Sequence, residues 1–268
     1  MTFSHKIRTL AGGAVLSLLA LSAGAGTLYF SEDRNTGGLY SLNTTTGAAT
    51  ALGATGVTGS TVGLAPSDNP NGLVGSRPFG LAAINADGSG SLSIPGTATA
   101  EGLAYDADND ALFGTINGSF FSYDAGFAST TSLAAPGADI EGLAWGGGST
   151  IFGLAGYSGP RGYLYSYDIV ADVWSFIGDT GIDFNLVGLA YNAAENVLYA
   201  KGSQDSYLYE IDTGTAFASI IGDTGIQNGG GLAYVGGAVA PVPVPGAVLL
   251  LGTGILGLGA LRRRRKTA

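Results

Sequence analysis

The sequence predicts an all-β fold, a β-propeller of five four-stranded blades closed into a ring by its two ends. Three observations support this prediction. A Gly-Leu-Ala triplet recurs at a period of about 40 to 45 residues, a spacing typical of propeller blades. Short apolar and aromatic segments separated by turn residues follow each copy, and the repeats at the two ends of the body are incomplete in complementary ways. The triplets that set the period begin at Gly63, Gly102, Gly142, Gly188 and Gly231.

The most regular units begin at Gly102, Gly142 and Gly188, and each reads as four strands of about four to six residues. The triplet and the aromatic residue after it form the first strand. An apolar-aromatic pair marks the second strand, and a Tyr- or Phe-rich segment ending in Asp marks the third. The fourth is indicated by Phe-Ile-Gly-Asp-Thr-Gly-Ile from Phe176 and by its near copy from Ile220.

The ends of the body predict that the ring closes. The segment from Thr27 supplies the second, third and fourth strands of a blade but lacks the triplet, whereas the repeat from Gly231 supplies a first strand alone. Together they complete a fifth blade, and the unit from Gly63 is the least regular of the other four. A β-sandwich and an open solenoid are the alternatives, because the strand count alone does not require closure.

The charge of the chain is divided between the body and the two ends. The body, residues 26–237, contains all 20 acidic residues but only four of the 11 basic ones, Arg34, Arg77, Arg161 and Lys201, which is a net charge of −16. Such a surface repels phosphate, so we expect no nucleic acid partner.

Carboxylates are the chemical groups from which a site in the body would be built. The chain has no Cys, and its single His, His5, lies near the N-terminus, so sites based on a His or Cys are excluded from the body. Glu101 and Glu141 each precede a Gly-Leu-Ala triplet in adjacent blades, with Asp139 on the same side of its strand as Glu141. We expect these carboxylates to face the centre of the ring, where they would bind a cation or act as an acid/base pair on sugars.

A second group of carboxylates forms an Asp-x-Asp-x-Asp pattern after a predicted strand. Asp106, Asp108 and Asp110 are hard oxygen donors at alternate positions, so they form a candidate Ca²⁺ site. Ala111 and Asn117 stand where an EF-hand loop has Gly and Glu, and a solvated hairpin turn is the alternative.

Residues 1–25 have the pattern of a secretory signal peptide. Lys6 and Arg8 are basic, Leu10 to Leu21 is apolar, and Ala23-Gly24-Ala25 fits the cleavage rule. We expect a signal helix here that is removed on export through the Sec translocon, and an uncleaved anchor is the alternative.

The C-terminus pairs a Pro-rich linker, residues 238–245, with an apolar helix and an Arg-rich tail, residues 246–268. The stretch from Gly246 to Leu261 has no charge in 16 residues. As a helix it would measure about 24 Å, which is short for a bilayer core of about 30 Å. The arginines would stay in the cytoplasm, which places the body on the other side of the membrane.

This tail resembles the PEP-CTERM sorting signal, in a variant where Val244 replaces the Glu of Val-Pro-Glu-Pro. The resemblance spans about 25 residues, from Val242 to Lys266. It rests on Val242, Pro243, Val244, Pro245, Gly246, Arg262, Arg263, Arg264 and Arg265. It implies a Gram-negative host that makes exopolysaccharide, transient anchoring in the inner membrane, and processing by an exosortase-type membrane enzyme. The product would then reach the cell surface, the outer membrane or the extracellular space. An ordinary single-pass anchor is the alternative.

We therefore expect a non-enzymatic surface or matrix protein that binds extracellular material such as exopolysaccharide in a biofilm. Two alternatives remain: a glycan-active enzyme that uses Glu101 and Glu141, and an adhesion module stabilised by Ca²⁺ at Asp106. We expect no cofactor apart from calcium in the last case.

Overall fold

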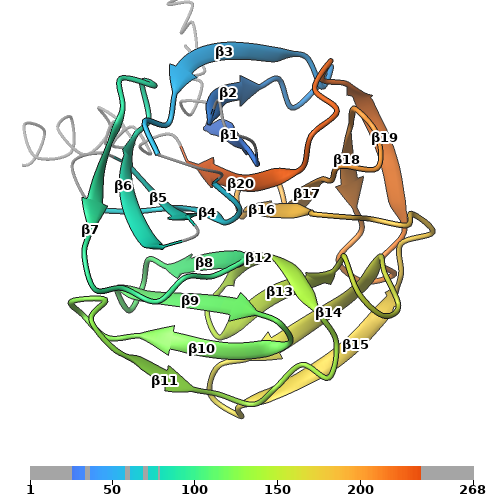
Figure 1. The fold of residues 1–268 in the computed structure, drawn as a ribbon. Helices are drawn as coiled ribbons and strands as arrows, with labels where there is room; N and C mark the ends of the chain where they lie inside the picture. The colour runs from blue at the N-terminus through green and yellow to red at the C-terminus, as the bar shows by residue number, and fades with distance from the viewer. Residues whose placement is uncertain (1–25, 34–36, 58–60, 69–71, 78, 237–268) are drawn as a thin grey trace, which may run out of the picture. The chain divides into compact units, whose positions relative to one another are not determined.

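The computed structural model describes residues 26–33, 37–57, 61–68, 72–77 and 79–236. Within them the chain is all-β, with twenty strands in five four-stranded antiparallel sheets set as blades around one axis (Figure 1). No helix occurs in these ranges. The predicted signal helix, linker, transmembrane helix and tail lie outside the described residues.

The blades are numbered from the one that contains both ends of the body. Blade 1 consists of β20 (Gly230–Val235), β1 (Thr27–Glu32), β2 (Gly38–Leu42) and β3 (Ala49–Ala54). Blade 2 consists of β4 (Leu64–Pro66), β5 (Gly72–Arg77), β6 (Gly80–Asn85) and β7 (Ser91–Ile94). Blade 3 consists of β8 (Gly102–Asp106), β9 (Ala111–Ile116), β10 (Ser119–Tyr123) and β11 (Thr130–Ser132). Blade 4 consists of β12 (Ile140–Gly147), β13 (Thr150–Ala155), β14 (Tyr163–Asp168) and β15 (Val173–Asp179). Blade 5 consists of β16 (Gly188–Asn192), β17 (Val197–Lys201), β18 (Tyr207–Ile211) and β19 (Ala218–Asp223).

Blade 1 closes the ring in the way the two incomplete repeats predict. Strand β20 pairs antiparallel with β1, and Phe30 lies opposite Leu232. Every strand at the centre is therefore a Gly-Leu-Ala strand, and the sequence-based prediction of five blades with a shared fifth is confirmed. The unit from Gly63, although the least regular in sequence, forms a complete four-stranded blade.

Close packing of the innermost strands explains the Gly of each triplet. The strands β4, β8, β12, β16 and β20 contact one another in sequence around the ring. A Cβ on Gly102 would lie 2.8 Å from the carbonyl oxygen of Glu141, and a Cβ on Gly63 would lie 2.8 Å from that of Glu101. Such distances are too short for any side chain, so the triplet glycines allow neighbouring blades to meet at the axis.

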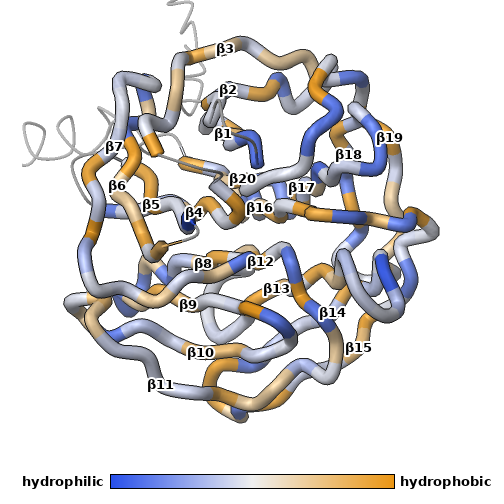
Figure 2. The backbone as a smooth tube through the Cα atoms, in the orientation of Figure 1, coloured by the Kyte–Doolittle hydropathy of each residue, from blue (hydrophilic) through white to orange (hydrophobic). Residues whose placement is uncertain are grey.

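The hydrophobic core is divided among the interfaces between blades. Five clusters of buried side chains each join two neighbouring blades, and Figure 2 shows hydrophobic residues in all five blades. Between blades 3 and 4, Phe120 stacks edge-on against Tyr167 and Trp174, and the Trp174 indole donates a hydrogen bond to Ala134 O at 2.9 Å. Because each blade buries its faces only against its neighbours, closure of the ring is a condition of stability.

In three of the fourth strands, β3, β15 and β19, an aliphatic residue followed by Gly forms a β-bulge. The register shifts by one residue where Leu39, Leu164 and Leu208 face Gly53, Gly178 and Gly222. The skipped residues, Leu52, Ile177 and Ile221, are thereby packed against the clusters between blades. The recurrence of an aliphatic residue followed by Gly in these strands therefore reflects a shared β-bulge.

Candidate functional site

The N-terminal face of the ring, where the five innermost strands begin, gathers the first predicted group of carboxylates. Glu101 immediately precedes β8, and its N–H donates to Thr115 O at 2.6 Å, which ties it to the end of β9. The side chain is held by the tight turn that follows β9, because the N–H of Asn117 donates to Glu101 Oε2 at 2.9 Å. Asn117 and Gly118 both have positive φ, as the Asn-Gly turn of a two-residue hairpin requires.

Asp139 precedes β12 and is held by the loop that follows β13. The N–H of Gly156 donates to Asp139 O at 3.0 Å, and the Ser158 hydroxyl donates to Asp139 Oδ2 at 2.5 Å. The second carboxylate oxygen, Oδ1, is buried and has no hydrogen-bond partner among the described residues. One oxygen of Asp139 is therefore fixed and the other is left without a donor.

Glu141 lies inside strand β12 and is the most enclosed of the three carboxylates, with 5% of its surface exposed. Its side chain lies against Gly156, where an added Cβ would be 2.7 Å from Glu141 Cγ. Val187, at the start of blade 5, packs beside the same glycine. None of the hydrogen bonds found among the described residues involves the Glu141 carboxylate, but its oxygens, unlike Asp139 Oδ1, are not fully shut off from solvent.

The three carboxylates meet although they come from two blades. One oxygen from each of Glu101, Asp139 and Glu141 lies within 4.8 Å of the other two. The sequence places Glu101 and Glu141 before equivalent strands, and the structure brings them together with Asp139. The sequence gives no sign of Asn117 or Ser158 as their hydrogen-bond donors, beyond the turn signal of Asn117-Gly118.

Burial and like charge oppose ionisation in this carboxylate cluster. Burial raises the pKa of Glu141 to about 8, with further contributions from the negative charges of Glu101, Asp139 and Asp33. Burial also raises the pKa of Glu101, although the hydrogen bond from Asn117 acts in the opposite direction. A buried carboxylate without donors or a positive neighbour keeps its proton unless a cation is bound.

A cleft of about 450 Å³ opens beside the cluster on the same face. Its lining includes Asn117, Gly118, Ala138, Asp139, Ser158 and Pro160. Asp139 and its donor Ser158 therefore line the cleft, as does Asn117, the donor to Glu101. A ligand in the cleft would meet backbone groups, a hydroxyl and a carboxylate edge.

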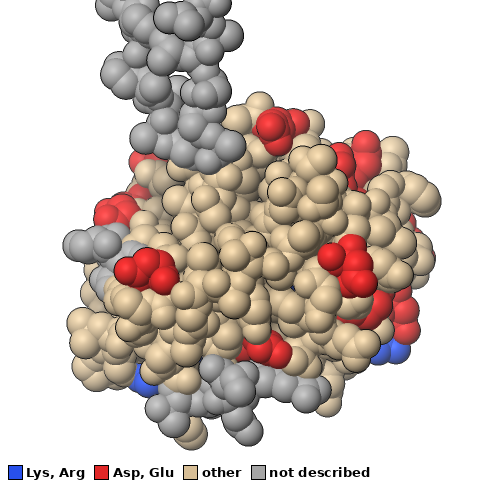
Figure 3. Space-filling view, turned by 90° about the horizontal axis from the view of Figure 1, so that it is seen from above, with Lys and Arg blue, Asp and Glu red and all other residues tan. Residues whose placement is uncertain are grey.

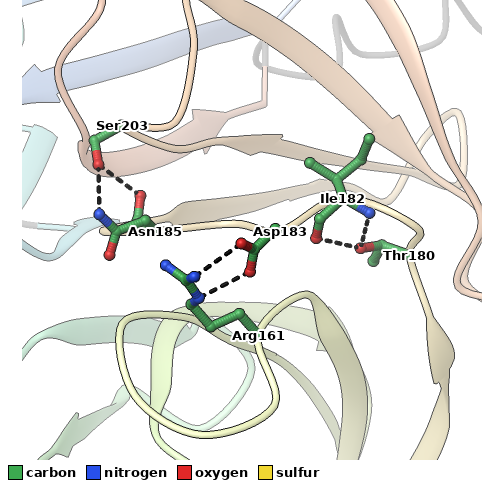
Figure 4. Close-up of polar contacts among 6 residues, drawn as sticks. All are labelled: Arg161, Thr180, Ile182, Asp183, Asn185 and Ser203. Atoms are coloured by element: carbon green, nitrogen blue, oxygen red, sulfur yellow. Dashed lines mark hydrogen bonds and ion pairs between the residues drawn. The ribbon is translucent and has the colours of Figure 1, made fainter.

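The three described basic side chains of the body do not contact the cluster. Arg161 makes a bidentate ion pair with Asp183 at 2.8 Å, which joins blades 4 and 5 on the N-terminal face beside the Asn185–Ser203 contact (Figure 4). Lys201 is fully buried and donates to the carbonyl oxygens of Gly202, Asp205 and Asn228. Arg77 contacts Ser93. Sequence reasoning did not single out Lys201, because a Lys at the end of a strand usually faces solvent.

The second predicted group of carboxylates, at Asp106, forms the turn between β8 and β9. Both Asp106 oxygens accept hydrogen bonds, Oδ1 from the N–H groups of Asp108 and Asn109 and Oδ2 from the Asn109 side chain. Asp110 accepts from the Tyr105 hydroxyl at 2.9 Å. These interactions stabilise a hairpin turn, and the three aspartates are not among the described acidic groups close enough to share an ion.

The same turn chemistry recurs in blades 4 and 5. Tyr167 donates to Asp172 at 2.7 Å and Tyr191 donates to Asn196 at 2.6 Å, with the acceptor five residues after the tyrosine as in Tyr105 and Asp110. The three acceptors, Asp110, Asp172 and Asn196, all have positive φ near 50°. Asp and Asn tolerate this conformation better than other residues, which explains their positions.

Acidic side chains are dispersed over the surface shown in Figure 3, and basic ones are few. The residues of the predicted sorting signature, Val242 to Gly246 and Arg262 to Arg265, lie outside the described ranges. Among the residues that the structure describes, no helix is long and apolar enough to span a membrane.

Comparison with known proteins supports the fold. No family model and no curated protein matches the sequence. Among solved structures, the chain is similar to one in the crystal structure of a nidogen/laminin complex, at 12% sequence identity and a TM-score of 0.52. The similarity covers 78% of this chain and 98% of the other. At this identity it shows the propeller fold alone.

Proposed function

We propose that this chain is an exported surface protein whose propeller is a non-enzymatic binding module for extracellular glycan. The observation that carries the proposal is the convergence of Glu101, Asp139 and Glu141, from two blades, at the edge of a cleft of about 450 Å³. Loops on one face of a rigid scaffold are a common location for ligand binding. The acidic surface argues against nucleic acid as the ligand.

The fold and the chemical groups of the body are compatible with a binding role. The similar solved chain comes from a complex between two other proteins, nidogen and laminin, so a propeller of this kind serves there in an assembly. The body contains no His or Cys, which leaves carboxylates, hydroxyls and aromatic rings as its chemical groups. These groups are well suited to hold sugars and cations.

The proposed export and sorting of the protein rest on the two ends of the chain. The signal-like residues 1–25 and the tail from Val242 to Arg265 support export through the Sec translocon and processing by an exosortase-type enzyme. Fractionation of the producing cells, with the mass of the surface form, tests this proposal. A surface form that has lost the tail supports sorting, and an unprocessed chain in the cytosol would refute it.

Binding is tested by co-sedimentation of the full chain, in mild detergent, with the exopolysaccharide of the cells that produce it. We expect Asp139→Asn, which alters the edge of the cleft, to weaken binding at least tenfold. Glu210→Gln is the matched control, because Glu210 is exposed in β18 and loses the same charge. Absence of wild-type binding, or equal binding by both variants, would remove the support for glycan recognition at this face.

A second candidate function is carboxylate-dependent glycan hydrolysis, favoured by one observation. Glu141, with a pKa raised to about 8, would be protonated at neutral pH beside the more exposed Glu101, as an acid and a base or nucleophile require. Release of reducing ends from the same polysaccharide would reveal turnover. If Glu101→Gln and Glu141→Gln both abolish this turnover, the module is an enzyme and the non-enzymatic proposal fails.

A further inference from the structure

The carboxylate cluster has the geometry of a cation site. Two oxygens that share one Ca²⁺ ion lie at most about 5 Å apart, because each Ca–O distance is about 2.3 to 2.6 Å. The oxygens of Glu101, Asp139 and Glu141 meet this requirement, since they lie within 4.8 Å of one another. Three carboxylates from the ends of two blades therefore lie close enough for small side-chain adjustments to bring one oxygen of each to the same ion.

A second, independent observation is that the buried side chain of Glu141 and one buried oxygen of Asp139 have no hydrogen-bond donor among the described residues. Glu141 is 95% enclosed and accepts no hydrogen bond from the described residues, and Asp139 Oδ1 is buried and unpartnered. Buried polar atoms in folded proteins almost always have a partner, and an exception requires an explanation such as an ion. Both unpartnered groups belong to the cluster, so a single bound cation would satisfy them together.

The local charge also lacks compensation. The groups that act on Glu141 are Glu101, Asp139 and Asp33, and all of them are acidic. Each described basic side chain is held elsewhere: Arg161 by Asp183, Lys201 by three carbonyl oxygens and Arg77 at Ser93. A divalent cation would offset most of the charge of three ionised carboxylates, which otherwise repel one another.

We propose that Glu101, Asp139 and Glu141 bind a Ca²⁺ ion on the N-terminal face of the propeller. All the donors are hard oxygens, which excludes a preference for soft metals such as Zn²⁺ bound by thiolates. Ca²⁺ accepts six to eight oxygen ligands in irregular arrangements, whereas Mg²⁺ requires a regular octahedron. Three carboxylates leave several ligand positions of the ion unfilled by protein.

The cleft beside Asp139 supplies the open side of this site. Ser158 and Asn117, which hold two of the carboxylates, also line the cleft, so water or a ligand there would reach the ion. Sugar hydroxyls and sugar carboxylates are oxygen donors of the kind that Ca²⁺ accepts. The role of the ion in capturing glycan rests on the proposed function, whereas Ca²⁺ binding itself can be tested without any glycan.

The experiment measures Ca²⁺ binding to the full chain in mild detergent, after treatment with EDTA and transfer to metal-free buffer. Equilibrium dialysis against radioactive Ca²⁺ gives stoichiometry and affinity, and melting with Ca²⁺, Mg²⁺ or EDTA gives an independent readout. We expect one ion per chain, a higher melting temperature in Ca²⁺ than in EDTA, and a smaller effect of Mg²⁺. No Ca²⁺ binding at millimolar concentration would overturn the inference, and glycan binding in EDTA would still be measurable.

Variants assign the ion to this site. We expect Glu141→Gln and Asp139→Asn each to lower Ca²⁺ affinity at least tenfold, with folding checked by circular dichroism. Gly156→Ala keeps every carboxylate but displaces the Glu141 side chain, so it should also weaken binding. Asp108→Asn, in the exposed turn after β8, and Glu210→Gln should bind as the wild type does. Loss of binding in Asp108→Asn with retention in Glu141→Gln would place the ion at the Asp106 turn and refute the assignment.

Discussion

Replacing Glu141 by Gln should change how the stability of the metal-free protein depends on pH. Burial raises the pKa of Glu141 from 4.5 to about 8, so the native state retains a proton there that the unfolded chain releases above about pH 4.5. Between these two values the native state binds more protons than the unfolded state. The free energy of unfolding therefore falls as the pH rises through this window, and the stabilising contribution is fully present only below it.

The size of the effect follows from the shift in pKa. One pKa unit corresponds to about 1.36 kcal/mol, so the rise to about 8 sets an upper bound of about 5 kcal/mol. The negative charge of Glu101 is one cause of this shift, and burial raises the pKa of Glu101 as well. The two groups share the effect, and we expect Glu141 alone to account for roughly 2–3 kcal/mol between pH 5 and pH 8.

Urea unfolding in EDTA, followed by the fluorescence of Trp145 and Trp174, measures this quantity at each pH. The wild type should lose stability from pH 5 to pH 8, and Glu141→Gln should lose much less because the amide does not titrate. At pH 8 the variant should be the more stable of the two. The exposed control Glu210→Gln should follow the wild type. Equal pH dependence in Glu141→Gln and the wild type would refute the assignment of a buried, protonated carboxylate to this position.

Three further predictions concern the ring itself and are read by urea unfolding or circular dichroism. Gly102→Ala should lower the free energy of unfolding by roughly 2–4 kcal/mol, because its Cβ would lie 2.8 Å from the backbone oxygen of Glu141. The control Gly126→Ala, in a surface turn, should change the free energy of unfolding by no more than about 1 kcal/mol. Equal losses in the two variants would contradict close packing at the axis. Lys201→Met should lower the free energy of unfolding by roughly 2–4 kcal/mol, because three carbonyl oxygens lose a charged donor. An unchanged free energy of unfolding would show that these hydrogen bonds contribute little to stability. A chain that ends after Gly229 lacks β20 and should not fold, whereas a chain that ends after Gly236 keeps β20 and should fold. A folded product from the shorter chain would show that blade 1 does not need its innermost strand.

The repeat made the propeller predictable because each of its parts has a local physical cause. Gly-Leu-Ala recurs because the innermost strands approach too closely for a side chain, as at Gly102. The aliphatic-Gly pairs recur because they form the same bulge in three blades. The turn residues Asp110 and Asn196 recur as acceptors for tyrosine hydroxyls. Because each of these causes acts at a fixed position in the repeat, it appears as a regular spacing in the sequence. Strand order and closure could therefore be inferred without coordinates.

The candidate site was predictable only in part. Equivalent positions before two triplets placed Glu101 and Glu141 on one face, and strand alternation added Asp139. Their separation of 4.8 Å or less could not be inferred, since it depends on how closely blades 3 and 4 pack. The enclosure of Glu141 depends on Gly156 and Val187, which are distant from it in sequence. At Asp106 the sequence left a calcium loop and a hairpin turn as alternatives, and only the hydrogen bonds show that its oxygens are used within the turn.

By itself, the sequence determined the repeat, the number of blades, the joining of the two ends in one blade and the acidic character of the body. Only the tertiary structure decided which carboxylates meet, which of their oxygens have donors and how deeply Glu141 is buried. The physical reason is that strand period and turn chemistry act over a few residues, whereas burial and unpaired charge are set by contacts between blades.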